Sequence, residues 1–62
     1  MRLENPTPSQ IKEARIALGL TQTEAAESVG AASYFTWQAW ETGRRKMPAA
    51  KWELFRLKNR LP

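Results

Sequence analysis

Three consecutive basic residues, Arg44, Arg45 and Lys46, are the side chains of this sequence best suited to a defined chemical task. Guanidinium and ammonium groups bind phosphate oxygens strongly, so the task that they suit is the binding of a polyanion. Residues 44–62 carry seven basic side chains against one acidic, a balance of +6, whereas residues 1–43 carry three against five, a balance of −2. This asymmetry favours a nucleic-acid partner, although a run of charges can also be no more than a solvated face.

The sequence offers little to catalysis. It contains no cysteine, histidine or aspartate, which removes disulfides, thiolate chemistry and the commonest metal ligands. Its six glutamates are spread along helical positions and beside basic residues, so we interpret them as solvated or ion-paired side chains rather than as an acid/base pair. We therefore expect no enzymatic activity, no metal and no cofactor, and the sequence gives no sign of a small-molecule ligand.

These basic side chains need a scaffold to position them, and the sequence predicts a compact all-α domain of four to five helices. Thr7 can cap the first helix, Pro8 suits its first position, and Gln10 can complete a capping box. Gly19 supplies a left-handed stop. We expect residues 1–6 to form a flexible arm.

A second capping box, formed by Thr21 and Glu24, predicts the start of a short second helix that ends at Gly30. Small apolar residues lie on one side of this helix: Ala25, Ala26 and Val29. Alanine lets a neighbouring helix approach closely, as a tight helix-turn-helix requires, although in so short a helix it can equally be an ordinary helix former.

The third predicted helix follows Ser33, its expected cap, and ends at Gly43. We expect Trp37 and Trp40 to point into the core, because a helix of this size must bury its largest apolar side chains; we favour this role over base stacking. The residues left more exposed are Tyr34, Phe35, Gln38 and Ala39.

The fourth predicted helix runs from Pro48 to about Asn59 and carries two apolar stripes. One stripe contains Met47, Ala50, Leu54, Leu57 and Leu61, and the other contains Trp52 and Phe55. A chain of 62 residues buries barely enough apolar surface to be stable alone, which favours a homodimer, although the last helix can also simply wrap deeply onto the core. The candidate residues of a dimer interface are Trp52, Phe55, Leu57 and Leu61.

In the order and spacing of its motifs, the sequence resembles the Cro and lambda-repressor type of helix-turn-helix proteins, particularly the very small regulators of phages and other mobile elements. The matching residues are Arg15, Gly19-Leu20-Thr21-Gln22, Ala26, Val29-Gly30, Trp37-Gln38, Trp40-Glu41, Gly43, Arg45 and Met47-Pro48. Each piece is weak by itself, but together they are specific and extend from Ile11 to about Leu57.

The resemblance implies a role for each matching position. Gln22 resembles a glutamine that contacts the DNA backbone and braces the recognition helix, and Arg15 and Glu41 match a pair that ties the first helix to the end of the third. The positions that read base edges in members of this family are Ser33, Tyr34, Phe35, Gln38 and Ala39. The loop that contacts DNA phosphates corresponds to Arg44, Arg45 and Lys46.

Two features depart from the family pattern. The chain holds one more residue than usual between Gly30 and Trp40, which predicts a longer turn before the third helix. Tyr34 and Phe35 also stand where other members more often carry glutamine, serine, asparagine or arginine. Aromatic side chains there can pack on thymine methyl groups or sugars, or they can fold back into the core.

The resemblance implies that residues 1–62 form a single DNA-binding domain and a sequence-specific regulator of transcription, expected to repress a promoter as a homodimer on an inverted repeat. A protein-interaction module of the same fold, antitoxin-like or coactivator-like, is the alternative, and an RNA-binding domain is a third. The basic loop and Gln22 favour double-stranded DNA, because an interaction module needs neither. With no bilayer-length apolar run and no signal-peptide core, we expect a cytoplasmic protein without a membrane partner.

Overall fold

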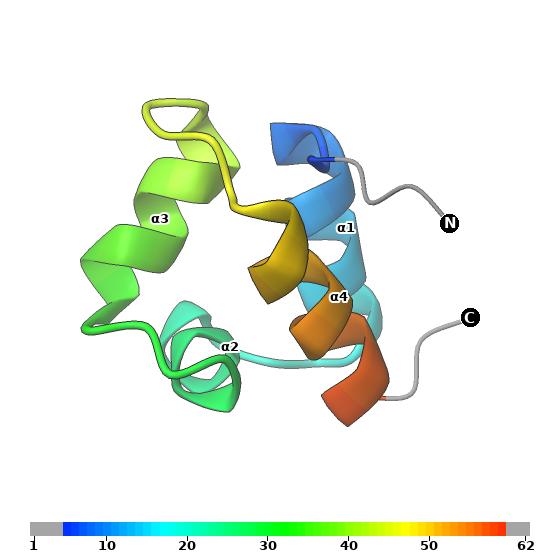
Figure 1. The fold of residues 1–62 in the computed structure, drawn as a ribbon. Helices are drawn as coiled ribbons and strands as arrows, with labels where there is room; N and C mark the ends of the chain where they lie inside the picture. Colours follow the sequence, from blue (N-terminus) through cyan, green and yellow to red (C-terminus); the bar gives the residue numbers. More distant parts are fainter. Residues whose placement is uncertain (1–4, 60–62) are drawn as a thin grey trace.

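The computed structural model describes residues 5–59, which form four helices and no strand (Figure 1). The helices are α1 (Pro8–Ala17), α2 (Gln22–Ser28), α3 (Tyr34–Thr42) and α4 (Ala49–Lys58). The all-α prediction is therefore confirmed for the described residues. Helix α3 packs against both α1 and α2, and α4 packs against α2.

Both predicted capping boxes are present. At the start of α1, the Thr7 hydroxyl accepts a hydrogen bond from the Gln10 backbone N–H at 3.1 Å, and the Gln10 side chain accepts one from the Thr7 backbone at 2.9 Å. Thr21 and Glu24 make the same reciprocal bonds at 3.1 and 2.8 Å at the start of α2. Each box satisfies two backbone donors that a helix start otherwise leaves to water, so the sequence determines both starting points locally.

The turns on either side of α3 determine where its ends point. Gly43 follows α3 with a φ of +81°, a left-handed conformation that costs other residues free energy, and so turns the chain into the basic loop. Ser33 occupies the N-cap position as predicted, but its side chain makes no capping hydrogen bond. The turn between α2 and α3 covers residues 29–33.

Aromatic side chains dominate the core. Trp37 and Trp40 are 0% and 5% exposed, which confirms that they point inward. The ring centroid of Trp37 lies 5.6 Å from that of Trp40 and 4.9 Å from that of Phe55, which joins α3 to α4. The remaining buried apolar residues are Ile11, Ala25, Ala26, Val29 and Met47.

Not all of the residues of α4 that were predicted to form a dimer interface are exposed. Phe55 is fully buried against Trp37, so its assignment to a dimer interface is wrong: the core already covers its ring. Trp52 is half-buried and stacks on Phe55 with ring centroids 6.1 Å apart. Leu57 is 71% exposed and remains a candidate, whereas Leu61 lies outside the described residues.

The segment before α1 is packed where it is described. The Asn5 side-chain amide donates a hydrogen bond to the Met47 carbonyl at 2.7 Å, and Pro6 is buried. Where the predicted flexible arm is described, Asn5 is therefore joined to a residue far along the chain and Pro6 is covered, so at these two residues the structure differs from a free arm. Residues 1–4 lie outside the described part.

Candidate nucleic-acid interface

The side of α3 opposite the tryptophans carries the side chains with which the sequence predicts base contacts. Phe35 is 64% exposed, Gln38 is exposed and Ala39 is half-buried. Within residues 5–59, neither the Ser33 hydroxyl nor the Gln38 side-chain amide has a hydrogen-bond partner, so both remain available to a ligand. The helix thus separates a core side from a side that offers polar and aromatic groups to solvent.

Tyr34 and Phe35 do not fold back into the core. Their rings stack on each other with centroids 4.2 Å apart and planes inclined by 28°. Tyr34 remains 41% exposed. The first turn of α3 therefore presents a paired aromatic surface, which resolves the alternative that the sequence left open.

The basic loop lies beside this exposed side of α3. A shallow hollow of about 310 Å³ is lined by Phe35, Gln38, Ala39, Thr42 and Arg44. The Arg45 backbone N–H donates to the Ala39 carbonyl at 3.2 Å, which ties the loop to the helix. Arg44 and the exposed residues of α3 therefore belong to one continuous surface.

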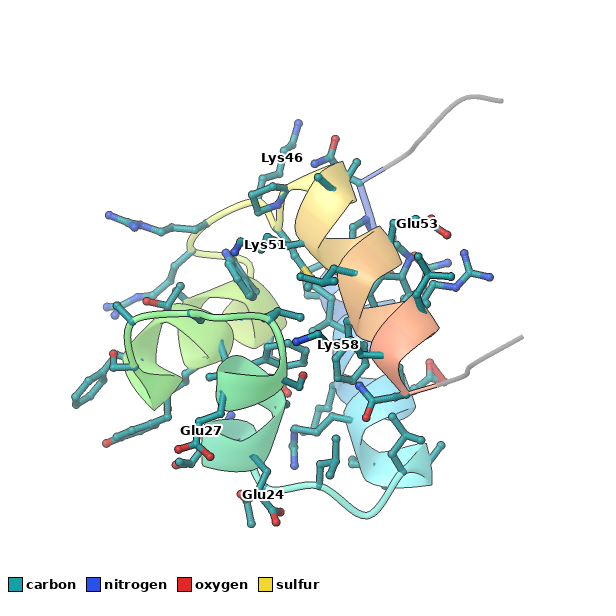
Figure 2. The ribbon with its side chains drawn as sticks, turned by 60° about the horizontal axis from the view of Figure 1, so that its bottom comes forward. Glu24, Glu27, Lys46, Lys51, Glu53 and Lys58 are labelled. Atoms are coloured by element: carbon teal, nitrogen blue, oxygen red, sulfur yellow. The ribbon has the colours of Figure 1, made fainter. Side chains whose placement is uncertain are left out.

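Within residues 5–59, no acidic side chain pairs with the charges of the basic loop. Arg44, Arg45 and Lys46 are all exposed, and none forms a salt bridge within residues 5–59. In the view of Figure 2, Lys46 lies toward one end of the molecule and Glu24 and Glu27 lie toward the other. The positive potential of the loop is thus not neutralised locally, as the binding of phosphates requires.

A mostly buried ion pair fixes α3 to α1. Arg15 Nε donates to Glu41 Oε2 at 2.5 Å and Arg15 Nη2 to Glu41 Oε1 at 3.3 Å, which confirms the predicted pair. Arg15 Nη1 also donates to the Leu20 carbonyl at 3.0 Å, so the same guanidinium ties down the chain after α1. The Arg15 and Glu41 side chains are only 16% and 4% exposed.

Glu41 accepts two further hydrogen bonds, one of which the sequence analysis missed. Gln22 Nε2 donates to Glu41 Oε1 at 3.3 Å, so Gln22 braces α3 as expected; its contact with DNA stays a prediction. The indole N–H of Trp37 donates to Glu41 Oε2, one helical turn along α3. The spacing of four residues between Trp37 and Glu41 was the available signal, since such pairs face each other on a helix.

These contacts determine the charge state of Glu41. Burial raises the pKa of its carboxyl, but the hydrogen bonds from Arg15, Trp37 and Gln22, together with the positive charge of Arg15, outweigh burial and leave the pKa below its usual value. Glu41 is therefore a carboxylate at neutral pH and works as a structural anchor.

Lys51 has a structural role that the sequence did not indicate. Lys51 lies in α4, and its ammonium group donates a hydrogen bond to the Val29 carbonyl at 2.8 Å. This bond satisfies a backbone acceptor at the C-terminal end of α2. Glu53 and Arg56 also approach to 3.7 Å on α4. Part of the positive charge of residues 44–62 therefore has a structural role, whereas Arg44, Arg45 and Lys46 form no salt bridge within residues 5–59.

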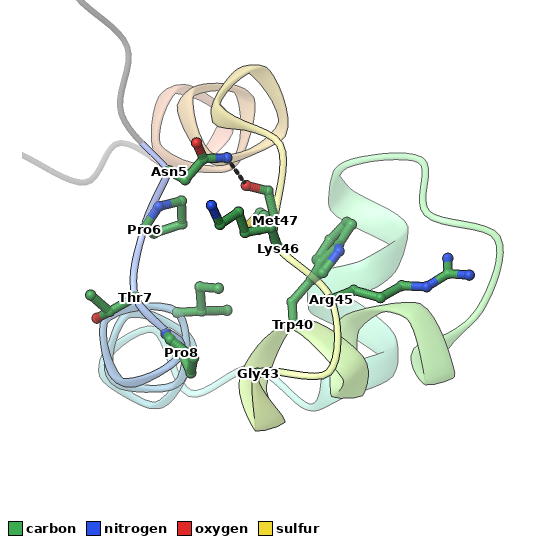
Figure 3. A pocket seen from close by; sticks show the side chains of 10 residues that line it. Asn5, Pro6, Thr7, Pro8, Trp40, Gly43, Arg45, Lys46 and Met47 are labelled. Atoms are coloured by element: carbon green, nitrogen blue, oxygen red, sulfur yellow. Dashed lines mark hydrogen bonds between the residues drawn. The ribbon is translucent and has the colours of Figure 1, made fainter.

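A second hollow, of about 610 Å³, lies between the segment before α1 and the basic loop (Figure 3). Asn5, Pro6, Thr7 and Pro8 line it together with Ile11, Trp40, Gly43, Arg45, Lys46 and Met47. In the close view the Arg45 side chain extends away from Pro6 and Pro8, so its guanidinium group lies apart from that wall of the hollow.

No protein-family model matches this sequence, and a search of curated proteins finds no similar one. Within residues 5–59 no helix is long and apolar enough to cross a membrane, and no group of three or more potential metal-binding side chains is present. The assignment of function therefore depends on the geometry described above.

Proposed function

We propose that this protein is a sequence-specific DNA-binding regulator of transcription with a lambda-repressor-type fold, in which α2 and α3 form the helix-turn-helix. One observation carries the proposal: Phe35, Gln38 and Arg44 line the same hollow, so groups that suit base edges and a group that suits phosphates face one side of the molecule. An α-helix of this kind fits the major groove, where base edges are distinguishable.

In this arrangement α3 is the recognition helix. Gln38 suits adenine, whose N6 and N7 pair with an amide, and Ser33 can donate to or accept from several bases. The Ala39 side chain, half-buried beside them, suits close approach to a base edge. The groups proposed to contact phosphates are Gln22, Arg44, Arg45 and Lys46.

We further propose that the protein acts as a homodimer on an inverted repeat. Each mismatched base pair costs only about 1–3 kcal/mol, so a single short helix selects a promoter poorly, and a second half-site raises selectivity. The half-sites are then about 34 Å apart, one turn of DNA. The exposed Leu57 and the half-buried Trp52 are the remaining described candidates for the dimer contact. Bound at a promoter, the dimer represses by occupying it.

Selection of bound duplexes from a random pool, followed by footprinting, tests this function. We expect an enriched inverted repeat whose two protected half-sites lie on one face of the DNA. Gln38→Ala should relax the preference at one position in each half-site and leave binding to unrelated DNA nearly intact. A pool that yields no enriched sequence contradicts the proposal and favours a protein-interaction module, and tighter binding to RNA than to duplex DNA favours an RNA-binding domain.

A further inference from the structure

The stacked pair at the start of α3 is the largest apolar group that the described surface exposes in one place. Tyr34 and Phe35 are 41% and 64% exposed, and the other large apolar side chains on that surface, Ile16 and Leu57, lie on different helices. Because the two rings already cover each other at 4.2 Å, each has one face engaged. What the pair offers outward is therefore a preformed apolar surface that loses little side-chain freedom on binding.

We infer that Tyr34 and Phe35 determine operator preference by recognising thymine 5-methyl groups in the major groove, an inference that rests on the proposed function. Phe35 has no hydrogen-bonding group, so a polar base edge placed against it loses its bonds to water without replacement. The thymine methyl is the apolar group that an unmodified base pair presents in the major groove. The Phe35 ring thus favours thymine and opposes the other bases, and Tyr34 supports it by stacking on its other face.

The surroundings of the rings favour DNA as the occupant of this surface over an apolar protein partner. Phe35 shares its hollow with Arg44, whose charge is unpaired among the described residues and suits a phosphate. Gln38 lies three residues beyond Phe35 and four beyond Tyr34, which places it on the same side of α3. A ring that suits a methyl group (Phe35), an amide that suits a base edge (Gln38) and a cation that suits a phosphate (Arg44) therefore line one surface.

Replacement of thymine by deoxyuracil tests the inference, because this change removes only the methyl group. Affinities are measured by fluorescence anisotropy for the selected duplex and for copies with single uracils in the half-site. We expect the wild-type protein to bind about fourfold more weakly for each contacted methyl removed. Phe35→Ala and Tyr34→Ala should lose this difference while their salt dependence stays unchanged.

Ile16→Ala is the matched control, because it removes another exposed apolar side chain at a site away from α3. It should keep the wild-type preference for thymine. Equal binding of the thymine and uracil duplexes by the wild-type protein, or a selected half-site without thymine, overturns this inference and leaves the proposed function standing. If no duplex sequence is preferred, both this inference and the proposed function are overturned. Tighter binding to single strands, without an effect of uracil, assigns the rings to base stacking instead.

Discussion

Arg15 Nε lies 2.5 Å from Glu41 Oε2, and this contact links α1 to the last turn of the helix that we propose reads DNA. Both side chains are mostly buried, so each charge depends on the other for the solvation that water no longer supplies. The pair therefore sets the orientation of α3 within the fold.

Arg15→Met should lower the free energy of unfolding by about 3 kcal/mol, because it leaves the Glu41 carboxylate buried without its cation. Urea unfolding of this variant, followed by tryptophan fluorescence, measures the loss. Combining it with Glu41→Leu should recover only part of the loss, since the Trp37 indole N–H and the Gln22 amide then lack their acceptor. If the two single losses simply add in the double variant, the residues do not act as partners.

Stability should fall in acid in a way that depends on Glu41. Its pKa is lower in the folded than in the unfolded protein, so between the two values the unfolded state binds more protons and stability rises with pH. This contribution is complete once the pH is well above 4.5, the ordinary pKa of this carboxyl, and is lost as the pH falls through the folded-state value. Urea midpoints at several pH values should therefore change less steeply for Glu41→Gln than for the wild type. Identical slopes would contradict this role.

Arg45→Ala should weaken binding to all DNA sequences about equally, because a phosphate contact carries no base information. The slope of log affinity against log salt concentration should flatten by roughly one unit. Lys58→Ala is the control: it removes an equal charge at the far end of α4 and should leave the slope unchanged. A slope that Arg45→Ala does not alter would remove the loop from the interface.

Lys51→Met should destabilise the protein by about 1 kcal/mol, because the Val29 carbonyl loses its charged donor while the aliphatic part of the side chain is kept. Lys12→Met, at an exposed position on α1, is the comparison and should have little effect on thermal unfolding. DNA binding by the folded Lys51→Met variant should match that of the wild type. A selective loss of affinity would instead assign Lys51 to the DNA contact.

Leu57→Glu should shift the protein from dimer to monomer in analytical ultracentrifugation, because it puts a charge into the proposed apolar contact. The footprint should then shrink to one half-site or disappear. Ile16→Glu adds the same charge at an exposed apolar position of α1, outside the stripe that contains Leu57, and should leave the dimer intact. A monomeric wild-type protein that still protects two half-sites would separate DNA binding from this surface.

Local signals made much of the fold predictable. The capping boxes at Thr7 and Thr21 depend on residues three positions apart, and the spacing of Trp37 and Trp40 marks the buried side of α3. Local patterns did not reveal contacts between distant residues: Asn5 bonds to Met47 across 42 positions and Lys51 to Val29 across 22.

The candidate site was predictable in its members but not in its arrangement. The motif placed Gln38 and Arg44 near each other in sequence, whereas only the structure shows that they line one hollow. The two apolar stripes of the last helix were equivalent as patterns, and the structure divides both of them: Met47 of one stripe and Phe55 of the other are buried, whereas Leu57 is exposed. The stacking of Tyr34 on Phe35 likewise had no signal beyond their adjacency.

The division of α3 into two sides has a consequence for how such a protein can evolve. Trp37, Trp40 and Glu41 hold the helix in place, whereas Tyr34, Phe35 and Gln38 contribute little to the core. Substitutions at the outward positions can therefore accumulate without loss of folding, because surface changes usually alter stability by less than about 0.5 kcal/mol. A duplicated gene could thus acquire a new target through a few point mutations in a scaffold that stays the same.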